Sequence, residues 1–141
     1  AKINIVDSFK KINNTKSKYD IILVDSWPRI SFGEAEHFNL FPKIFDILND
    51  KGILIILVMN EINGNSVPEN LLNIRKLFYD VDDPKNITFN EMIDTYNKFA
   101  LKKNFMIIDW FYVDRWFLYF FTKLFREKRL CFLVMIVNKE K

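Results

Sequence analysis

The feature that most constrains this chain is the run of four apolar residues Ile21–Val24, which lies between Asp20 and Asp25. So short a run, rich in β-branched residues and bounded by charged ones, predicts a strand buried on both faces of a parallel sheet. The Ser26–Pro28 segment cannot continue that strand. Ligands bind open parallel sheets at the carboxyl ends of the strands. We therefore expect the segment from Asp25 to Pro28 to line a ligand site.

The remaining pattern alternates strands with helices. Further strands are predicted over residues 2–6, 53–59, 105–113 and 130–138, and helices over 40–49, 66–79, 88–100 and 115–126. That order favours an α/β sheet that is parallel in the middle and closes with antiparallel strands. At 141 residues, half of them hydrophobic, the chain forms one domain (1–141) with a large core.

Local signals place the ends of several helices. Gly52 is predicted to end the helix over 40–49 in a left-handed turn, which glycine adopts without steric cost. Ser66–Glu69 and Thr88–Glu91 both match the capping box, which opens a helix. The residues predicted to face inward are Leu71, Ile74 and Phe78 in the first of these two helices and Phe89, Met92, Ile93, Tyr96, Phe99 and Ala100 in the second.

The composition limits the cellular compartment and the classes of partner that we expect for this chain. Cys131 is the only cysteine and lies in an apolar run, so we expect a buried thiol and a reducing, cytoplasmic setting. The apolar runs are shorter than the ~18 residues of a membrane span, and no signal peptide is visible at Ala1. The net charge of +3 does not by itself indicate nucleic acid. The basic excess over 114–141 is typical of a solvated face, with an anionic partner as the alternative.

Three pieces of the chain resemble class I S-adenosylmethionine-dependent methyltransferases. Ile5–Phe9 resembles the third strand of that family's sheet, and Tyr19–Asp25 resembles the fourth. Phe45–Leu54 resembles the next helix, turn and fifth strand, and segments 105–113 and 130–138 would be the antiparallel strands that close the fold. The resemblance implies a Rossmann-like three-layer sandwich with a mostly parallel sheet and an antiparallel last strand. It also implies methyl transfer from S-adenosylmethionine to an acceptor that the sequence does not identify.

One part of the family's pattern is missing, namely the Gly-rich turn that brings the backbone close to the cofactor. The three glycines are dispersed, at positions 33, 52 and 64. The chain therefore resembles the carboxyl-terminal half of a methyltransferase, a partial domain that we expect to bind the cofactor weakly or not at all by itself. The alternatives are a non-catalytic methyltransferase-like subunit or interaction module, and a phosphoacceptor receiver domain, whose phosphorylation strand Tyr19–Asp25 also resembles.

The resemblance further implies roles for residues at the strand exits. Asp25 would be the catalytic base or charge partner, and Trp27 and Pro28 would form an apolar wall beside the sulfonium methyl. His37 would be a general base, with an ordinary surface position as the alternative; Asp7 has the alternative of capping the turn after its strand. The residues implied for the cofactor are Asp7, Ser8, Phe9, Asp25 and Ser26, and those for the substrate are Trp27, Pro28, His37, Asn60 and Glu61.

Asp25, Asn60 and Glu61 also resemble the Mg²⁺ ligands of cation-dependent O-methyltransferases, because carboxylate and amide oxygens suit that ion. Here the amide precedes the acid, the reverse of that family's order, so we assign no metal. His37 has no second histidine, and no cysteine at metal-ligand spacing, which argues against zinc.

The Trp116–Phe125 segment is apolar on nearly every side. One layer of sheet cannot cover all faces of such a helix. The segment therefore fits a helix wedged between the sheet and its neighbours, a homo-oligomer interface, an apolar substrate pocket, or membrane contact aided by Arg126, Lys128 and Arg129.

Overall fold

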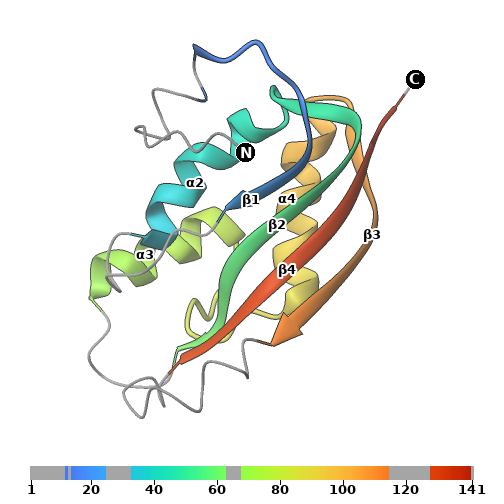
Figure 1. The fold of residues 1–141 in the computed structure, drawn as a ribbon. Coiled ribbons are helices and arrows are strands. Elements are labelled where there is room, and N and C mark those ends of the chain that lie inside the picture. Colours follow the sequence, from blue (N-terminus) through green and yellow to red (C-terminus); the bar gives the residue numbers. More distant parts are fainter. Residues whose placement is uncertain (1–11, 13, 25–32, 63–67, 115–127, 141) are drawn as a thin grey trace, which may run out of the picture.

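The computed structural model describes residues 12, 14–24, 33–62, 68–114 and 128–140, with the backbone alone described at 33–37, 114 and 128–130. The elements in these residues are β1 (Tyr19–Val24), α2 (Gly33–Ile44), β2 (Leu48–Ile62), α3 (Glu69–Tyr79), α4 (Phe89–Leu101), β3 (Phe105–Asp114) and β4 (Lys128–Lys139) (Figure 1). The strand predicted over 2–6 and the helix predicted over 115–126, which contains Trp116–Phe125, lie outside the described residues.

The four described strands form one sheet in the order β1-β2-β4-β3. β1 and β2 are parallel, with Val24 opposite Ile56, and β4 is antiparallel to both of its neighbours. β1, β2 and β3 therefore share one direction, and β4 runs against them between β2 and β3 (Figure 1). This confirms the predicted α/β class with an antiparallel last strand. The parallel pairing of segment 19–24 with segment 53–56 also agrees with the prediction that the sheet is parallel in its middle.

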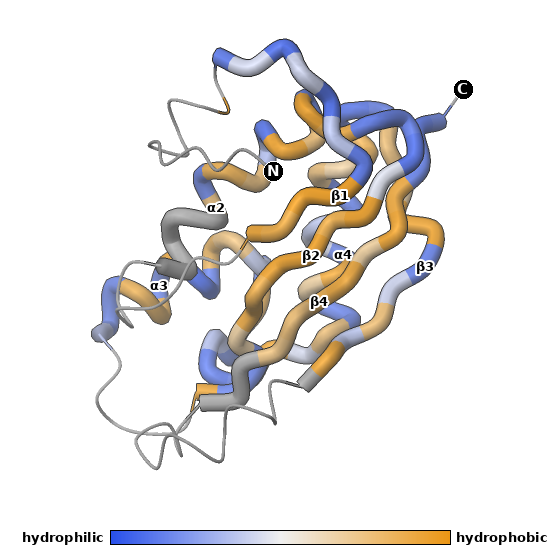
Figure 2. The backbone as a smooth tube through the Cα atoms, in the orientation of Figure 1, coloured by the Kyte–Doolittle hydropathy of each residue, from blue (hydrophilic) through white to orange (hydrophobic). Residues whose placement is uncertain are grey.

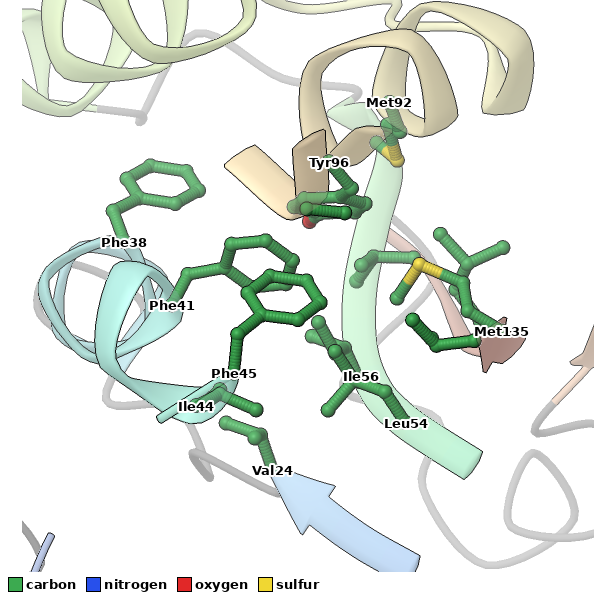
Figure 3. Close-up of a cluster of buried hydrophobic side chains, with 14 of the residues drawn as sticks. Val24, Phe38, Phe41, Ile44, Phe45, Leu54, Ile56, Met92, Tyr96 and Met135 are labelled. Carbon is green, nitrogen blue, oxygen red and sulfur yellow. The ribbon is translucent and has the colours of Figure 1, made fainter. Parts of the chain in front are cut away.

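The helices of the described residues pack on one face of the sheet and form the core there. Figure 3 shows Phe41 of α2, Phe45 of the turn that follows α2, and Tyr96 of α4 facing Ile56 and Met135 of the sheet. The Phe41 and Tyr96 rings stack with their centroids 4.5 Å apart. Alternate residues of β2 and β4 supply the sheet side of the core: Leu54, Ile56, Val58, Cys131, Leu133, Met135 and Val137. Each fully buried side chain of this size contributes about 1.5–3 kcal/mol, and the burial of Cys131 was predicted.

The second face of the sheet carries no helix within the described part of the chain, so the third layer of the predicted sandwich is not among these residues (Figure 1). The prediction that β1 is buried on both faces is therefore wrong. Ile21 is 59% exposed and Leu23 is 57% exposed, because their side chains lie on this second face, whereas Val24 is buried against the helices. Figure 2 shows that the strands are hydrophobic along most of their length.

The helix predicted over 40–49 lies earlier in the chain, and the strand after it is longer than expected. α2 spans Gly33–Ile44, so it begins before the predicted residue 40, and β2 already begins at Leu48. Gly52 therefore does not end a helix but lies within β2, opposite Val137 of β4. A Cβ atom at Gly52 would lie 2.6 Å from the Leu48 Cδ1 atom, so a larger residue here would have to displace the Leu48 side chain.

The two predicted capping boxes have different outcomes. At the start of α4, the Thr88 hydroxyl accepts a hydrogen bond from the Glu91 N–H at 3.2 Å, and the Glu91 carboxylate accepts one from the Thr88 N–H at 2.8 Å. The box at Ser66–Glu69 is wrong, because the N-cap of α3 is Pro68, which makes no side-chain cap. None of the helices in the described ranges has the length and apolar character needed to cross a membrane.

The close approach at Gly52 can be tested with Gly52→Ala. The added methyl group must displace the buried Leu48 side chain, and overpacking of this kind costs about 1–3 kcal/mol of unfolding free energy. Urea denaturation measures the loss. The control is Lys51→Ala, an exposed neighbour on the same strand, which should change the unfolding free energy by less than about 0.5 kcal/mol. Equal stability of the two variants would contradict the close packing of Leu48 on Gly52.

Candidate functional site

The candidate site is the edge of the sheet at which the parallel strands β1 and β2 end. β1 ends at Val24, opposite Ile56, and β2 continues to Asn60 and Glu61 before it ends at Ile62. The chain therefore leaves β1 at the edge where Asn60 and Glu61 lie, which is where ligands bind in open α/β sheets.

Several residues predicted for this site cannot be placed. Seven of them lie outside the described residues: Asp7, Ser8, Phe9, Asp25, Ser26, Trp27 and Pro28. His37 lies in α2, where only its backbone is described. The structure thus places Asn60 and Glu61 next to each other on β2. That they lie close to the other predicted site residues stays a prediction.

Asn60 lies at an irregularity in the pairing of β2 with β4. The register shifts between Met59 and Glu61, which leaves Asn60 as the extra residue of a bulge. Bulges redirect side chains and are common beside functional sites. The Asn60 carbonyl accepts a hydrogen bond from the Ile87 N–H at 2.9 Å, which fixes the backbone at this point.

The side chain of Asn60 has an unused hydrogen-bond acceptor. Asn60 is only 8% exposed, and its Oδ1 atom is buried without a hydrogen-bond donor from the described residues. A buried acceptor left in this state costs about 1–3 kcal/mol. A group carrying an N–H or O–H hydrogen would satisfy this acceptor.

Glu61 is held in place by the segment before α4. Glu61 forms an isolated antiparallel bridge with Asn86, and the Ile62 N–H donates to the Lys85 carbonyl at 2.9 Å. Glu61 is partly exposed. The carboxyl end of β2 therefore offers a buried amide oxygen and a partly exposed acidic residue next to each other on a supported strand.

Arg75 of α3 lies behind this edge and was missed by the sequence analysis, which predicted Ile74 to face inward. Ile74 is exposed, whereas Arg75 is fully buried. The Arg75 Nη2 donates to the Met59 carbonyl at 2.8 Å, and its Nε donates to the Pro84 carbonyl at 2.8 Å. Its guanidinium carbon lies 5.8 Å from the centre of the Tyr79 ring. Arg75 thus fixes the residue before Asn60 relative to α3 and to the segment that supports Glu61.

A second buried polar contact joins α3 to α4 beneath the site. The Tyr79 and Tyr96 hydroxyl oxygens lie 2.8 Å apart and share a hydrogen bond, and the Thr95 hydroxyl donates to the Tyr79 carbonyl at 3.2 Å. Because each polar group is matched, the contact orients the two helices without leaving a buried group unsatisfied. These groups hold α3 and α4 together.

Asp83 stabilises the turn before α4, next to Lys85 and Asn86, which pair with the end of β2. Its carboxylate accepts hydrogen bonds from the Asn86 side-chain amide at 2.8 Å and from the Lys85 N–H at 3.0 Å. These hydrogen bonds lower the pKa of Asp83 below its ordinary value of 3.8, because they favour the ionised form. The hydrogen bond from Asn86 has the largest effect on this pKa. The ionised Asp83 therefore holds Asn86 in position against Glu61.

Within the described ranges, no group of three histidine, cysteine, aspartate or glutamate side chains is placed to hold a metal ion. The possible Mg²⁺ ligands considered from the sequence include Asp25, which lies outside those ranges. No metal role is therefore assigned to Asn60 or Glu61.

No model of a known protein family matches this sequence, and no curated protein matches it. Among solved structures, the chain is similar to TYW2 of M. jannaschii in complex with AdoMet, with 12% identity, a TM-score of 0.49, and coverage of 92% of this chain and 43% of that one. It is also similar to a methyltransferase from Pyrococcus furiosus, with 15% identity, a TM-score of 0.36, and coverage of 86% of this chain and 42% of that one. A possible exported protein from Bordetella parapertussis is similar with 11% identity, a TM-score of 0.45, and coverage of 89% of this chain and 41% of that one.

The chain thus spans less than half of the length of these proteins. At such identities and TM-scores, the activity and the ligands of this chain have to be inferred from its own residues.

The role of Asp83 predicts a pH-dependent stability. Because its pKa is lower in the folded protein than the ordinary 3.8, Asp83 stabilises the fold above pH 3.8, and this contribution is lost as the pH falls through the folded-state pKa. We expect Asp83→Asn to lower the melting temperature at pH 7 and the difference from the wild type to shrink below pH 3.8. Thermal melts from pH 2.5 to 7 measure this.

The control for that series is Asp82→Asn. Asp82 is fully exposed and forms a 3.9 Å surface ion pair with Lys76, so its loss should change the melting temperature little at any pH. A deficit of Asp83→Asn that stayed constant or grew toward low pH would contradict the assigned role.

Proposed function

We propose that this chain forms the carboxyl-terminal half of an S-adenosylmethionine-dependent methyltransferase and lines the acceptor side of its active site. The observation that carries the proposal is the strand order: β1 and β2 are parallel and joined through α2, and the reversed strand β4 lies between β2 and β3. The resemblance assigns these strands to the fourth, fifth and two closing strands of that family. The resemblance rests on residue types, and the strand order rests on backbone pairing.

The same strand order argues against a receiver domain. Receivers are doubly wound folds of the flavodoxin type, whose ligands bind at the carboxyl ends of a parallel sheet. Here an antiparallel strand pairs with β2 from Lys51 to Ile62 and separates it from β3. A phosphoacceptor role for Asp25 has no support from this arrangement.

The residues that would hold the cofactor and the acceptor are those predicted at the strand exits. S-adenosylmethionine supplies a methyl group on a positively charged sulfur, which an acceptor nucleophile can take. Asp25 would orient that nucleophile and take its proton, and Trp27 and Pro28 would exclude water beside it. Asp7, Ser8, Phe9 and Ser26 would contact the adenosine part of the cofactor, and His37 is a further candidate on the acceptor side.

The described residues favour an acceptor that donates hydrogen bonds. The buried Asn60 Oδ1 atom can only accept, and it receives no hydrogen bond within the described part of the chain. An amine or a hydroxyl group supplies the missing hydrogen, whereas a thioether or an aliphatic carbon does not. We therefore propose an amine or hydroxyl compound as the acceptor, bound by Asn60 and oriented by the neighbouring Glu61 carboxylate.

One sequence observation favours the second candidate, a non-catalytic methyltransferase-like subunit. The chain has no Gly-rich turn, and its glycines lie far apart. Such a subunit would keep the fold and the strand exits but would show no methyl transfer in any assembly. The two candidates are therefore separated by turnover and not by structure.

The catalytic proposal predicts different effects for the two aspartates that flank the Ile21–Val24 run. In a protein that joins this chain to a Gly-rich cofactor segment, Asp25→Asn should reduce methyl transfer by about 10²- to 10⁴-fold, because a base or charge partner of the nucleophile is lost. Transfer of a labelled methyl group from S-adenosylmethionine to amine and hydroxyl compounds measures the rate.

The matched control is Asp20→Asn, at the opposite end of β1. The Asp20 carboxylate is exposed and accepts a hydrogen bond from the Asn49 side chain at 2.5 Å, so this change affects stability alone. Equal rates in the two variants would remove Asp25 from the mechanism. Absence of transfer in the wild type would favour the non-catalytic subunit.

A further inference from the structure

Arg75 on α3 is the only charged residue that is buried within the described ranges. It lies on the inward face of α3 between Leu71 and Tyr79, each one helical turn away and also buried. An apolar residue is the usual choice at such a position, since burying a charge is costly unless its hydrogen-bond donors are matched. Arginine at this position is therefore explained by the acceptors that it contacts, which an apolar side chain could not bind.

The two carbonyl groups that Arg75 contacts belong to different segments of the chain. Its Nη2 donates to the Met59 carbonyl and its Nε donates to the Pro84 carbonyl, both at 2.8 Å. Because the peptide unit is planar, the direction of each carbonyl also fixes the nitrogen of the residue that follows, which is Asn60 in one segment and Lys85 in the other. Both donors belong to one planar guanidinium group. Arg75 thus orients two peptide planes relative to each other.

Two backbone hydrogen bonds join the same segments directly after these peptide planes. The Ile87 N–H donates to the Asn60 carbonyl and the Ile62 N–H donates to the Lys85 carbonyl, each at 2.9 Å. So short a pairing is marginally stable by itself, and the pairing of β2 with β4 is irregular at Asn60 as well. A contact from the helix layer is therefore needed to keep the two segments in register.

We propose that Arg75 is a positioning residue of the candidate site, which holds the 59–62 end of β2 and the 84–87 segment in one arrangement. Asn60 and Glu61 lie in the first of these segments, so the place of their backbone depends on Arg75. Sites of this kind need their binding groups held within about 0.5 Å by the residues around them. The link to acceptor binding rests on the proposed function, whereas the positioning of the two segments does not.

The shape of the guanidinium group separates this role from that of an ordinary buried side chain. Lysine keeps the charge but carries a compact ammonium group on a flexible stem, which holds two acceptors in a less fixed geometry than a planar fork. Methionine is unbranched and fills irregular gaps in a core, but it has no donor. Arg75→Lys and Arg75→Met therefore separate hydrogen bonding from packing.

The test is amide hydrogen exchange in the 141-residue chain, followed by NMR. The Ile62 and Ile87 amides report on the pairing of the two segments, and the Leu133 amide, in the middle of a strand paired on both sides, reports on global unfolding. In Arg75→Met, the Ile62 and Ile87 amides should exchange at least about tenfold faster than in the wild type and still faster than Leu133. Arg75→Lys should give intermediate rates.

The control is Thr95→Val, which removes another buried hydrogen bond of α3, the one to the Tyr79 carbonyl, and nearly keeps the side-chain shape. It should leave the Ile62 and Ile87 exchange rates within about twofold of the wild type. Wild-type rates at these two amides in a folded Arg75→Met or Arg75→Lys variant would overturn the proposal.

Loss of the folded state in both Arg75 variants, seen by far-UV circular dichroism, would overturn the proposal as well, because Arg75 would then serve the whole core and not the end of β2. The outcome is independent of catalysis. Absence of methyl transfer would contradict the proposed function and leave the expected exchange rates unchanged.

Discussion

The pairing of β4 with β2 is the interaction on which the rest of the structure depends. β2 is the longest strand, and it pairs with β1 on one side and with β4 on the other. The register Leu54–Met135 and Ile56–Leu133 brings the buried residues of both strands to the same face, where α2 and α4 cover them. A shift by one residue would turn all of these side chains to the opposite face of the sheet. The core, and the place of β3 beyond β4, thus follow from this one register.

Arg75 links α3 to the end of β2, where the candidate site lies. A fully buried guanidinium group is stable only when its donors are matched, and here two of them reach the carbonyls of Met59 and Pro84. These two carbonyls belong to segments that lie far apart in the sequence and meet beside Asn60 and Glu61. The Asp83 turn holds the second segment from its other end. The backbone at the strand exit is therefore held on the side that the structure describes, where the buried Asn60 Oδ1 receives no hydrogen bond from the described residues.

The sequence predicted what depends on local pattern. The short apolar runs predicted the parallel pair β1 and β2, and the Thr88–Glu91 spacing predicted the start of α4, because the physical causes lie within a few residues. The burial of β1 was not predictable, since a run of four apolar residues looks the same whether one or both faces are covered. Gly52 was assigned to a turn because its close contact with Leu48 exists only after β2 has paired. Arg75 was missed because arginine is rarely buried, although its spacing from Leu71 and Tyr79 places it on their face of α3. Most of the candidate site residues lie outside the described ranges, so their predicted roles rest on the resemblance.

The most direct test of this account is the identity of the strand beside β2, measured by NMR in solution. Cross-strand backbone NOEs should join residues that are paired in the antiparallel register, such as Ile53 with Ile136 and Ile55 with Val134, and none should join β2 to β3. Direct NOEs between β2 and β3 would place those two strands side by side in a parallel sheet. That result would contradict the inserted antiparallel strand and, with it, the strand order on which the proposed function rests.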